Sequence, residues 1–334
     1  MTGQRLPERR RNRNRPAASI LLLTGILGGC AYLAREAMIV YLKVNTEFSP
    51  KEIDIEIDKS FLEKYKNRVG ITTTFTVDKS MQNPQSRLLD GDFHLAGRAP
   101  EVGLPVVAEI ANAALFTKAT DLVHAAERTG RPLKISGVWR IWAEHAKRAE
   151  EVQGEPLDPA RSENPGHVFE VHPVTRINEI ELLESFRPIK GFLPGDAHDT
   201  FGIYKNIECT LKVKPGAISI ITRTGIYNNV GFIMEIVDDR QIEVPGGRFV
   251  IASARDLKGD LLVDRLRMVF ADDTPPEEAV RRLKRGDRLR VYGLPRINLE
   301  EISRRVRGSR ADPALLTKPL PYEIIIQGVY EEAK

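Results

Sequence analysis

The chain has 334 residues and a formal net charge of +4, and 42% of its residues are hydrophobic. This length predicts about two domains, and the composition excludes a polytopic membrane protein and a disordered chain. Two cysteines exclude a disulfide-built scaffold and a cysteine-rich zinc module. Residues 1–16 hold six arginines against one glutamate, so the chain from Cys30 onward sums to −1. The positive charge therefore belongs to the leader and not to the folded part.

The N-terminal leader has the pattern of a membrane-targeting segment. Its arginines precede an uncharged apolar run, 17–29, which is short for a transmembrane helix and suits the hydrophobic region of a signal sequence. The run ends in Leu-Gly-Gly-Cys at Cys30, which resembles the lipobox of bacterial lipoproteins, and this resemblance implies lipidation of Cys30. Because the uncharged stretch continues to Ala34, an uncleaved anchor helix is the alternative. Both place the body outside the cytoplasmic membrane, in the periplasm or at the cell surface.

Strand patterns dominate from residue 50 onward, and one pattern occurs twice. Residues 130–141 read GRPLKISGVWRI, and residues 286–297, which lie 156 positions later, read GDRLRVYGLPRI. A helix is predicted before each copy, from about Ala108 to Arg128 and over Pro275–Arg285. A closing strand is predicted after each copy, at 167–172 and 322–326. The body is therefore predicted to contain two copies of one β unit.

The order of strands, helix, Gly-strand-Gly and closing strand predicts a five-stranded barrel with one helix at its end. The LKRGDRLRVYG segment of the second copy resembles the fourth strand of an OB-fold. We expect a mainly β protein with two OB-like five-stranded barrels in tandem, each with one helix, behind the signal or anchor helix. Another small mixed β fold is the alternative. The predicted divisions are the leader 1–34, the first barrel 35–187, a linker 188–199 and the second barrel 200–334.

Acidic and histidine residues gather in the first copy: Asp90-Gly91-Asp92-Phe93-His94, Glu109, Glu144-His145, and His167-Val168-Phe169-Glu170-Val171-His172-Pro173. This pattern resembles an uncharacterised bacterial module, D-x-D-x-H followed by E-[IL]-H-P, over roughly residues 70–180. The resemblance supports the boundaries of the first barrel and implies no activity.

These residues make a divalent metal site one interpretation of the first copy. On a single strand Asp90, Asp92 and His94 would face one way, whereas alternation places His167 opposite Glu170 and His172. Carboxylates and imidazoles that converge in a barrel suit zinc, manganese or iron. The alternative is a structural hydrogen-bond network or a metal-free ligand site. The predicted metal ligands are Asp90, Asp92, His94, His145, His167 and His172.

Two other segments are candidate binding surfaces. Trp139 and Trp142 flank Arg140, and one of the two rings is a candidate stacking platform, with a place in the core as the alternative. Residues 281–310 hold 11 basic and three acidic residues, which predicts an anion-binding surface or else a solvated face. The basic residues predicted to bind are Arg281, Arg282, Lys284, Arg285, Arg304, Arg305 and Arg307.

Together these features predict a membrane-anchored envelope protein that binds or assembles and is not a catalyst. Its expected partners are the membrane, through the N-terminus, and an anionic surface, a polymer or another envelope protein; nucleic acid is less favoured. We expect no cofactor, with a divalent metal as the alternative. The alternative function is a metal-dependent hydrolase, similar to a phosphodiesterase or nuclease, that uses the Asp/His residues of the first copy.

Overall fold

The computed structural model describes residues 52–223 and 228–330, and these belong to one compact unit. The predicted leader, 1–34, with Cys30 lies outside the described residues. Among the helices that are described, none has both the length and the hydrophobicity needed to cross a bilayer.

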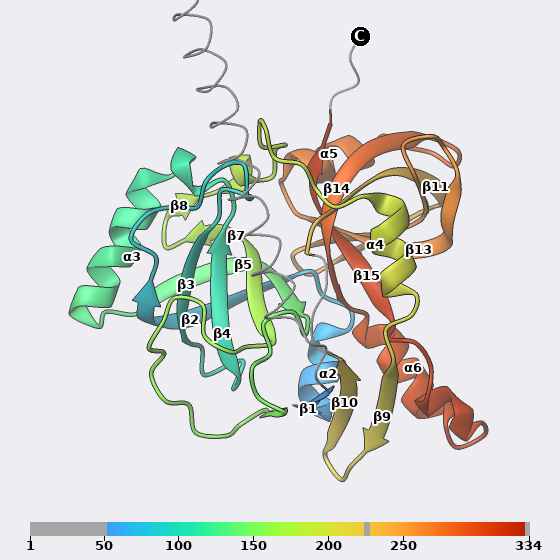
Figure 1. Ribbon diagram of the computed structural model, residues 1–334, viewed down its shortest axis with the longest axis horizontal. Coiled ribbons are helices and arrows are strands. Elements are labelled where there is room, and N and C mark those ends of the chain that lie inside the picture. The colour runs from blue at the N-terminus through green and yellow to red at the C-terminus, as the bar shows by residue number, and fades with distance from the viewer. Residues whose placement is uncertain (1–51, 224–227, 331–334) are drawn as a thin grey trace, which may run out of the picture. The chain divides into compact units, whose positions relative to one another are not determined.

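The first barrel consists of β2 Gly70–Ser80, β3 Phe93–Arg98, β4 Pro105–Ile110, β5 Leu133–Ile141 and β7 Phe169–Ile177. Strand β2 pairs antiparallel with β3 and β5, and β3 pairs antiparallel with β4. Strand β7 closes the barrel because it pairs antiparallel with β5 and parallel with β4. Helix α3, Thr117–Thr129, connects β4 to β5 (Figure 1).

The second barrel repeats this topology with β11 Val230–Val244, β12 Gly247–Arg255, β13 Leu261–Ala271, β14 Arg288–Ile297 and β15 Tyr322–Val329. Strand β15 closes it, antiparallel to β14 and parallel to β13. The short helix α5, Pro275–Val280, lies between β13 and β14. The prediction of a mainly β protein with two five-stranded barrels is confirmed.

A third sheet, which the sequence patterns did not predict, joins segments that lie outside both barrels. It has the order β6 Glu150–Val152, β1 Glu52–Asp58, β10 Ala217–Arg223 and β9 Cys209–Val213. Strand β1 precedes the first barrel, whereas β9 and β10 lie between the barrels in the chain, so this sheet connects the two. The remaining elements are α2 Lys59–Tyr65, β8 Ile180–Glu181, α4 Ala197–Tyr204, α6 Leu299–Gly308 and the 3₁₀ turns Ala113–Leu115, Leu183–Ser185 and Pro313–Leu316.

The boundaries of two predicted helices were wrong. The helix expected from about Ala108 begins at Thr117, because Pro105–Ile110 is strand β4. Almost every residue of β4 is buried, so the strand lacks the polar alternation that separates a strand from a helix in a sequence. The helix expected over Pro275–Arg285 ends at Val280.

The second glycine of each repeat is required by barrel closure. Gly137 and Gly293 lie at irregular positions where the fourth strand meets the closing strand. A Cβ atom on Gly137 would lie 2.6 Å from the carbonyl oxygen of Pro173, and one on Gly293 would meet the carbonyl oxygen of Ile325. A side chain at either position would therefore separate the two strands.

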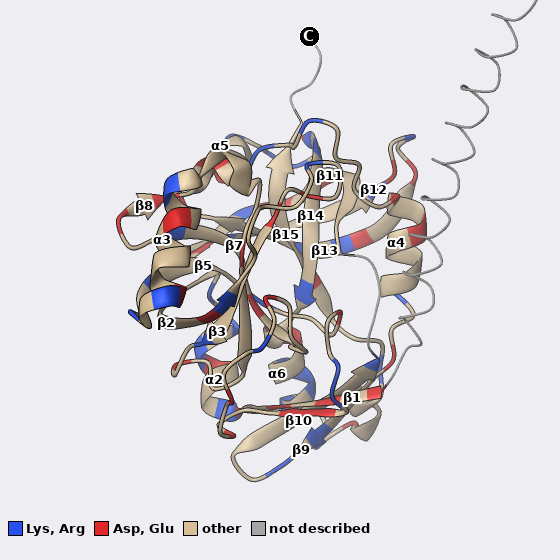
Figure 2. Ribbon diagram, turned by 60° about the vertical axis from the view of Figure 1, so that its left-hand side comes forward, with Lys and Arg blue, Asp and Glu red and all other residues tan. Residues whose placement is uncertain are grey.

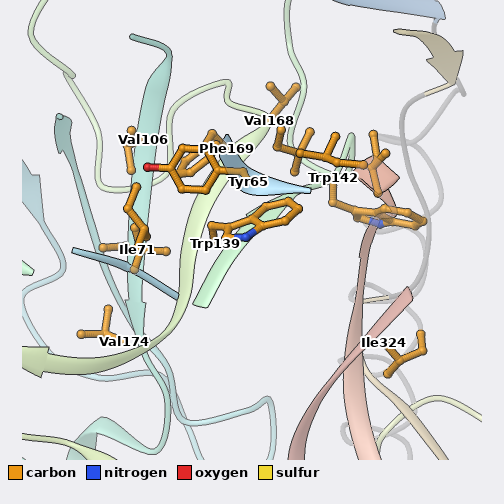
Figure 3. Close-up of a cluster of buried hydrophobic side chains, with 14 of the residues drawn as sticks. Tyr65, Ile71, Val106, Trp139, Trp142, Val168, Phe169, Val174 and Ile324 are labelled. Atoms are coloured by element: carbon orange, nitrogen blue, oxygen red, sulfur yellow. The ribbon is translucent and has the colours of Figure 1, made fainter. Parts of the chain in front are cut away.

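The strands of the first barrel alternate between an apolar interior and an outer face. Phe93, Trp139 and Phe169 belong to the main hydrophobic core, and Figure 3 shows Trp139 and Phe169 beside Tyr65 of α2. Because successive side chains of a strand point to opposite sides, the residues next to them point outward. His94 and Glu170 therefore lie on the outer face, where the candidate site forms.

Candidate metal centre

Three neighbouring strands bring acidic and histidine side chains to one place on the outer face of the first barrel. His94 on β3 lies opposite Glu109 on β4 in the register of that pair. Strand β7 contributes Glu170 and His172, which are two residues apart and share a face. The buried members of the cluster are Asp92, His94, Glu109, His167, Glu170 and His172.

Asp90 and Asp92 were predicted to lie on one strand with His94. In the structure they belong to the turn that precedes strand β3. Strand β3 begins at Phe93, and the turn before it has Gly91 in the left-handed region, with φ of 72°. The backbone N–H of Asp92 donates to the carboxylate of Asp90 at 3.3 Å. This turn buries Asp92 and leaves Asp90 half-buried.

His172 lies at the centre of the cluster. Its Nε2 is 3.4 Å from Oδ2 of Asp92, and its Nδ1 is 2.9 Å from Oε2 of Glu109 and 3.4 Å from Oε2 of Glu170. The side chain is buried, and neither ring nitrogen has a hydrogen-bond partner among the described residues. Three carboxylates therefore surround the imidazole of His172, and none of these contacts has the alignment of a hydrogen bond.

His167 lies on the same side as Glu170, so the prediction of opposite faces was wrong. Strand β7 begins only at Phe169, and strict alternation does not apply to the residues before it. Nε2 of His167 is 3.3 Å from Oε1 of Glu170, and its Nδ1 is 3.0 Å from the carbonyl oxygen of Pro165. The other oxygen of Glu170, Oε2, pairs with Nη1 of Arg140.

His145 stands at the edge of the cluster. Its ring stacks on that of His167, with centroids 5.1 Å apart and planes inclined by 20°. Its side chain is 23% exposed, and its Nε2 is 3.8 Å from Oε1 of Glu144. Of the six predicted ligands, the structure thus gathers Asp92, His94, His167 and His172 and leaves His145 and Asp90 at the border.

Glu109 and Glu170 are part of the cluster but were missing from the predicted ligands. Each is a lone acidic residue within an otherwise apolar strand, in Val106–Ile110 and in Val168–Val171. A buried strand tolerates a charge only where that charge has a partner. This signal was present in the sequence, but the partners are set by strand pairing.

Burial and neighbouring charges shift the pKa values of the clustered groups. Burial, together with the carboxylates of Asp90 and Glu109, raises the pKa of Asp92 well above its usual value, against the opposing effect of His172. Burial lowers the pKa of His172, but the carboxylates of Glu109, Glu170 and Asp92 outweigh burial and raise it well above the usual range. Both shifts favour the protonated forms of Asp92 and His172.

A pocket of about 310 Å³ opens beside the cluster. His94 and Glu109 line it, together with Asp90, Glu144 and His145 at its edge. Phe192–Gly195 from the predicted linker and Asn228 and Asn229 also line it. Two strongly exposed leucines stand at its wall, Leu89 at 60% and Leu193 at 86% exposure. No lysine or arginine of the described chain lines the pocket.

The candidate binding residues Trp139, Arg140 and Trp142 are buried, and both tryptophans belong to the core, as the alternative interpretation predicted. Trp139 is 0% exposed and donates from Nε1 to the carbonyl of Arg68, and Trp142 is 3% exposed. Figure 3 shows both rings inside the cluster of apolar side chains. Arg140 is likewise 0% exposed, so none of the three offers a surface to an external ligand.

The basic residues predicted as one surface form two separate groups. One group follows α5 and the other lies on α6, and Figures 1 and 2 place these helices at opposite ends of the second barrel. Glutamates pair with five of the seven cations, which lowers the local positive charge. These ion pairs are Arg281–Glu277, Arg282–Glu278, Arg304–Glu301, Arg305–Glu301 and Arg307–Glu300.

The second barrel contains the same Arg–Glu pair as the first but not the cluster beside it. Arg296 faces Glu323 in the strand register as Arg140 faces Glu170. Counting along the paired strands from these positions gives the counterparts: His94 corresponds to Phe249, Glu109 to Val269 and His172 to Ile325. These counterparts pack in a small hydrophobic cluster between the barrels. The barrel itself therefore does not require polar groups at these positions.

Comparison with known proteins gives only distant likenesses. No protein-family model and no curated protein matches the sequence. The single-stranded DNA binding protein from Thermus aquaticus is similar with a TM-score of 0.21 and 10% identity, over 80% of this chain and 93% of that one. A structure described as structural mimicry for functional antagonism has a TM-score of 0.17 and 12% identity, over 71% of this chain and 90% of that one. Neither likeness bears on function at such TM-scores.

Proposed function

We propose that the first barrel binds a divalent metal ion between Asp92, Glu109 and His172, and that the protein is a metal-dependent hydrolase. The observation that carries this proposal is the environment of His172. Its two ring nitrogens lie within ion-pair distance of carboxylate oxygens, at 2.9 and 3.4 Å, and neither contact has the alignment of a hydrogen bond. One ligand atom from each of the three residues lies within 4.8 Å of the others.

The charge of the buried groups supports a cation. Asp92 and Glu109 offer carboxylate oxygens and His172 offers an imidazole nitrogen, whereas Glu170 pairs with Arg140. Buried carboxylates are costly unless they are paired or coordinate a metal. The mixed imidazole and carboxylate ligands suit zinc, manganese or iron.

The second barrel supports a functional origin for the cluster. The second barrel has apolar residues at the positions equivalent to His94, Glu109 and His172, and it contains the Arg–Glu pair. A hydrogen-bond network needed for folding would be expected in both barrels, since their strand topology is the same. The polar cluster is therefore better explained by a ligand than by stability.

The pocket supports a small substrate that carries an apolar group. Its volume of about 310 Å³ lies in the range of small-molecule sites. The absence of lysine and arginine from its described lining favours an uncharged ester or amide over a phosphodiester. Leu89 and Leu193 provide apolar contacts at its wall.

His94 is the residue placed to move the proton in such a reaction. Its side chain lines the pocket, and its Nε2 lies 3.5 Å from Oε2 of Glu109. An ion held by Asp92, Glu109 and His172 would make a water molecule more acidic and so supply the nucleophile for an ester or amide carbonyl. His94 would accept the proton of that water and return it to the alcohol or amine that leaves when its bond to the carbonyl carbon breaks.

The membrane-anchored binding or assembly role remains a prediction. The leader that supports it lies outside the described residues, and the basic residues do not form one surface in the structure. Anchoring at the N-terminus is compatible with a hydrolase in the first barrel, so the two proposals do not compete on location.

Metal content tests the proposed function. The full-length protein is stripped with a chelator, reloaded with Zn²⁺ or Mn²⁺, freed of excess metal and analysed by mass spectrometry of the elements. We expect the wild type to bind at least one ion for each chain. The variants His172→Ala and His172→Ile should lose the ion at this site; isoleucine is the residue that the second barrel has at the equivalent position, Ile325. His198→Ala is the matched control, because His198 is 78% exposed on α4. A reloaded wild-type protein without metal would refute the proposal.

Activity is tested on the same preparations. We expect the loaded protein to cleave p-nitrophenyl esters or anilides with apolar groups more rapidly than bis-p-nitrophenyl phosphate. Preferential cleavage of the phosphodiester would contradict the substrate class while leaving the metal site intact.

A further inference from the structure

We infer that a second divalent ion binds beside the first, at Glu109, His167 and Glu170, and that the carboxylate of Glu109 bridges the two ions. This inference rests on the proposed function, because it places the second ion next to the first site. One ligand atom from each of these three buried residues lies within 4.8 Å of the others. The two sets of three ligands share only Glu109.

The orientation of His167 is that of a metal ligand. Its Nδ1 lies 3.0 Å from the carbonyl oxygen of Pro165, and a carbonyl only accepts, so the proton of a neutral ring is on Nδ1. The lone pair of Nε2 then faces Oε1 of Glu170 at 3.3 Å, and Nε2 has no hydrogen-bond partner among the described residues. A positive charge between these two buried atoms, carried by a proton or by a metal ion, satisfies both of them. Metal-binding histidines commonly donate their second N–H to a backbone carbonyl in this way.

The two oxygens of Glu170 have different partners. Oε2 pairs with Nη1 of Arg140, whereas Oε1 faces His167 and is available to an ion. Arg140 is itself held by the carbonyl of Pro295 at 2.8 Å and by Glu144 at 3.1 Å. Arg140 is therefore a positioning residue that orients Glu170 and leaves one carboxylate oxygen for metal.

Glu109 is placed to serve both ions. Its Oε2 is 2.9 Å from Nδ1 of His172, in the first set of ligands, and it belongs to the second set with His167 and Glu170. A carboxylate has two oxygens and can hold one ion on each. Sites with two metals, about 3.5–4 Å apart, clamp the attacking and leaving oxygens of a hydrolytic reaction.

Manganese provides a direct test, because two Mn²⁺ ions that share a carboxylate are spin-coupled and give an electron paramagnetic resonance spectrum distinct from that of isolated Mn²⁺. The full-length protein is stripped, loaded with Mn²⁺, freed of excess ion, and examined for metal content and for coupling. We expect two ions for each chain and a coupled spectrum in the wild type. In His167→Gln we expect one ion and no coupling, with His198→Ala unchanged from the wild type.

The wild-type result alone decides the inference, so a variant that fails to fold does not affect it. One ion for each chain, sensitive to His172→Ile and without coupling, would overturn the second site and leave the proposed function standing. No bound ion would overturn both. Two ions without coupling would overturn the bridging role of Glu109.

Discussion

Arg140 and Arg296 each donate a hydrogen bond to the backbone carbonyl of the residue that precedes the other. Nε of Arg140 donates to Pro295 at 2.8 Å, and Nη1 of Arg296 donates to Trp139 at 2.9 Å. The guanidinium of Arg296 also lies over the ring of Trp139, 3.8 Å from its centroid. The two repeats therefore pair through equivalent strands, and the arginine of each repeat belongs to the contact between the barrels.

Replacing Arg296 with methionine tests this contact. We expect the free energy of unfolding to fall by about 2–4 kcal/mol, because the change breaks a buried ion pair with Glu323 and leaves carbonyl groups without donors. Part of the charge on Glu323 remains paired with Arg267. Urea denaturation measures the change, and Arg307→Ala, at an exposed position on α6, is expected to stay within about 0.5 kcal/mol of the wild type. Equal effects of the two substitutions would contradict a structural role for Arg296.

Transferring the residues of the second barrel to the first separates a metal site from a structural network. The triple variant His94→Phe, Glu109→Val and His172→Ile should lose all bound metal. Relative to the metal-free wild type, its free energy of unfolding should be unchanged or increase by about 1–4 kcal/mol, because well-packed apolar residues often outperform buried charges. Chemical denaturation in the presence of a chelator measures both proteins. A loss of more than about 3 kcal/mol would show that the polar cluster holds the barrel together.

Three glycine substitutions test how the barrels close. In Gly137→Ala the new Cβ would lie 2.6 Å from a carbonyl oxygen, so we expect destabilisation of about 2 kcal/mol or more. Gly130→Ala should cost about 1 kcal/mol, because Gly130 has space around it but a φ of 68°. Gly202→Ala, inside α4 with no atom within 4 Å, should stabilise by about 0.5–1 kcal/mol. The order of the three thermal midpoints checks the argument, and a Gly137→Ala variant as stable as the wild type would refute it.

The thiol of Cys209 should be nearly unreactive in the folded protein. Burial raises its pKa to about 11, so only about one thiol in a thousand is ionised at pH 8. In a Cys30→Ser background, which isolates this thiol, reaction with Ellman's reagent should be at least about 100-fold slower than in the urea-unfolded chain. The rate should rise with pH toward the pKa, because the thiolate is the reacting form. A fast reaction at pH 8 in the folded protein would contradict the burial of Cys209.

The sequence by itself determined the repeated β unit. Gly137 and Gly293, together with Arg140 and Arg296, recur at one spacing because the same closure and the same contact occur in both barrels. Some strands were recognisable from β-branched residues and alternation, as in β2 at Gly70–Ser80. The repeat and the strand propensity are properties of short stretches of the chain, so a local sequence pattern is sufficient to predict them.

Only the tertiary structure decided the membership of the candidate site. Glu109 and Glu170 join the histidines because β4 pairs parallel with β7, a pairing between residues about sixty positions apart. His167 reaches the same side because the regular strand begins after it. The basic residues that follow α5 and those on α6 are close in the chain but separate in space, since strand β14 carries the chain from one end of the barrel to the other. Strand register and the direction of the chain across a barrel arise from long-range packing, and a local sequence pattern contains neither.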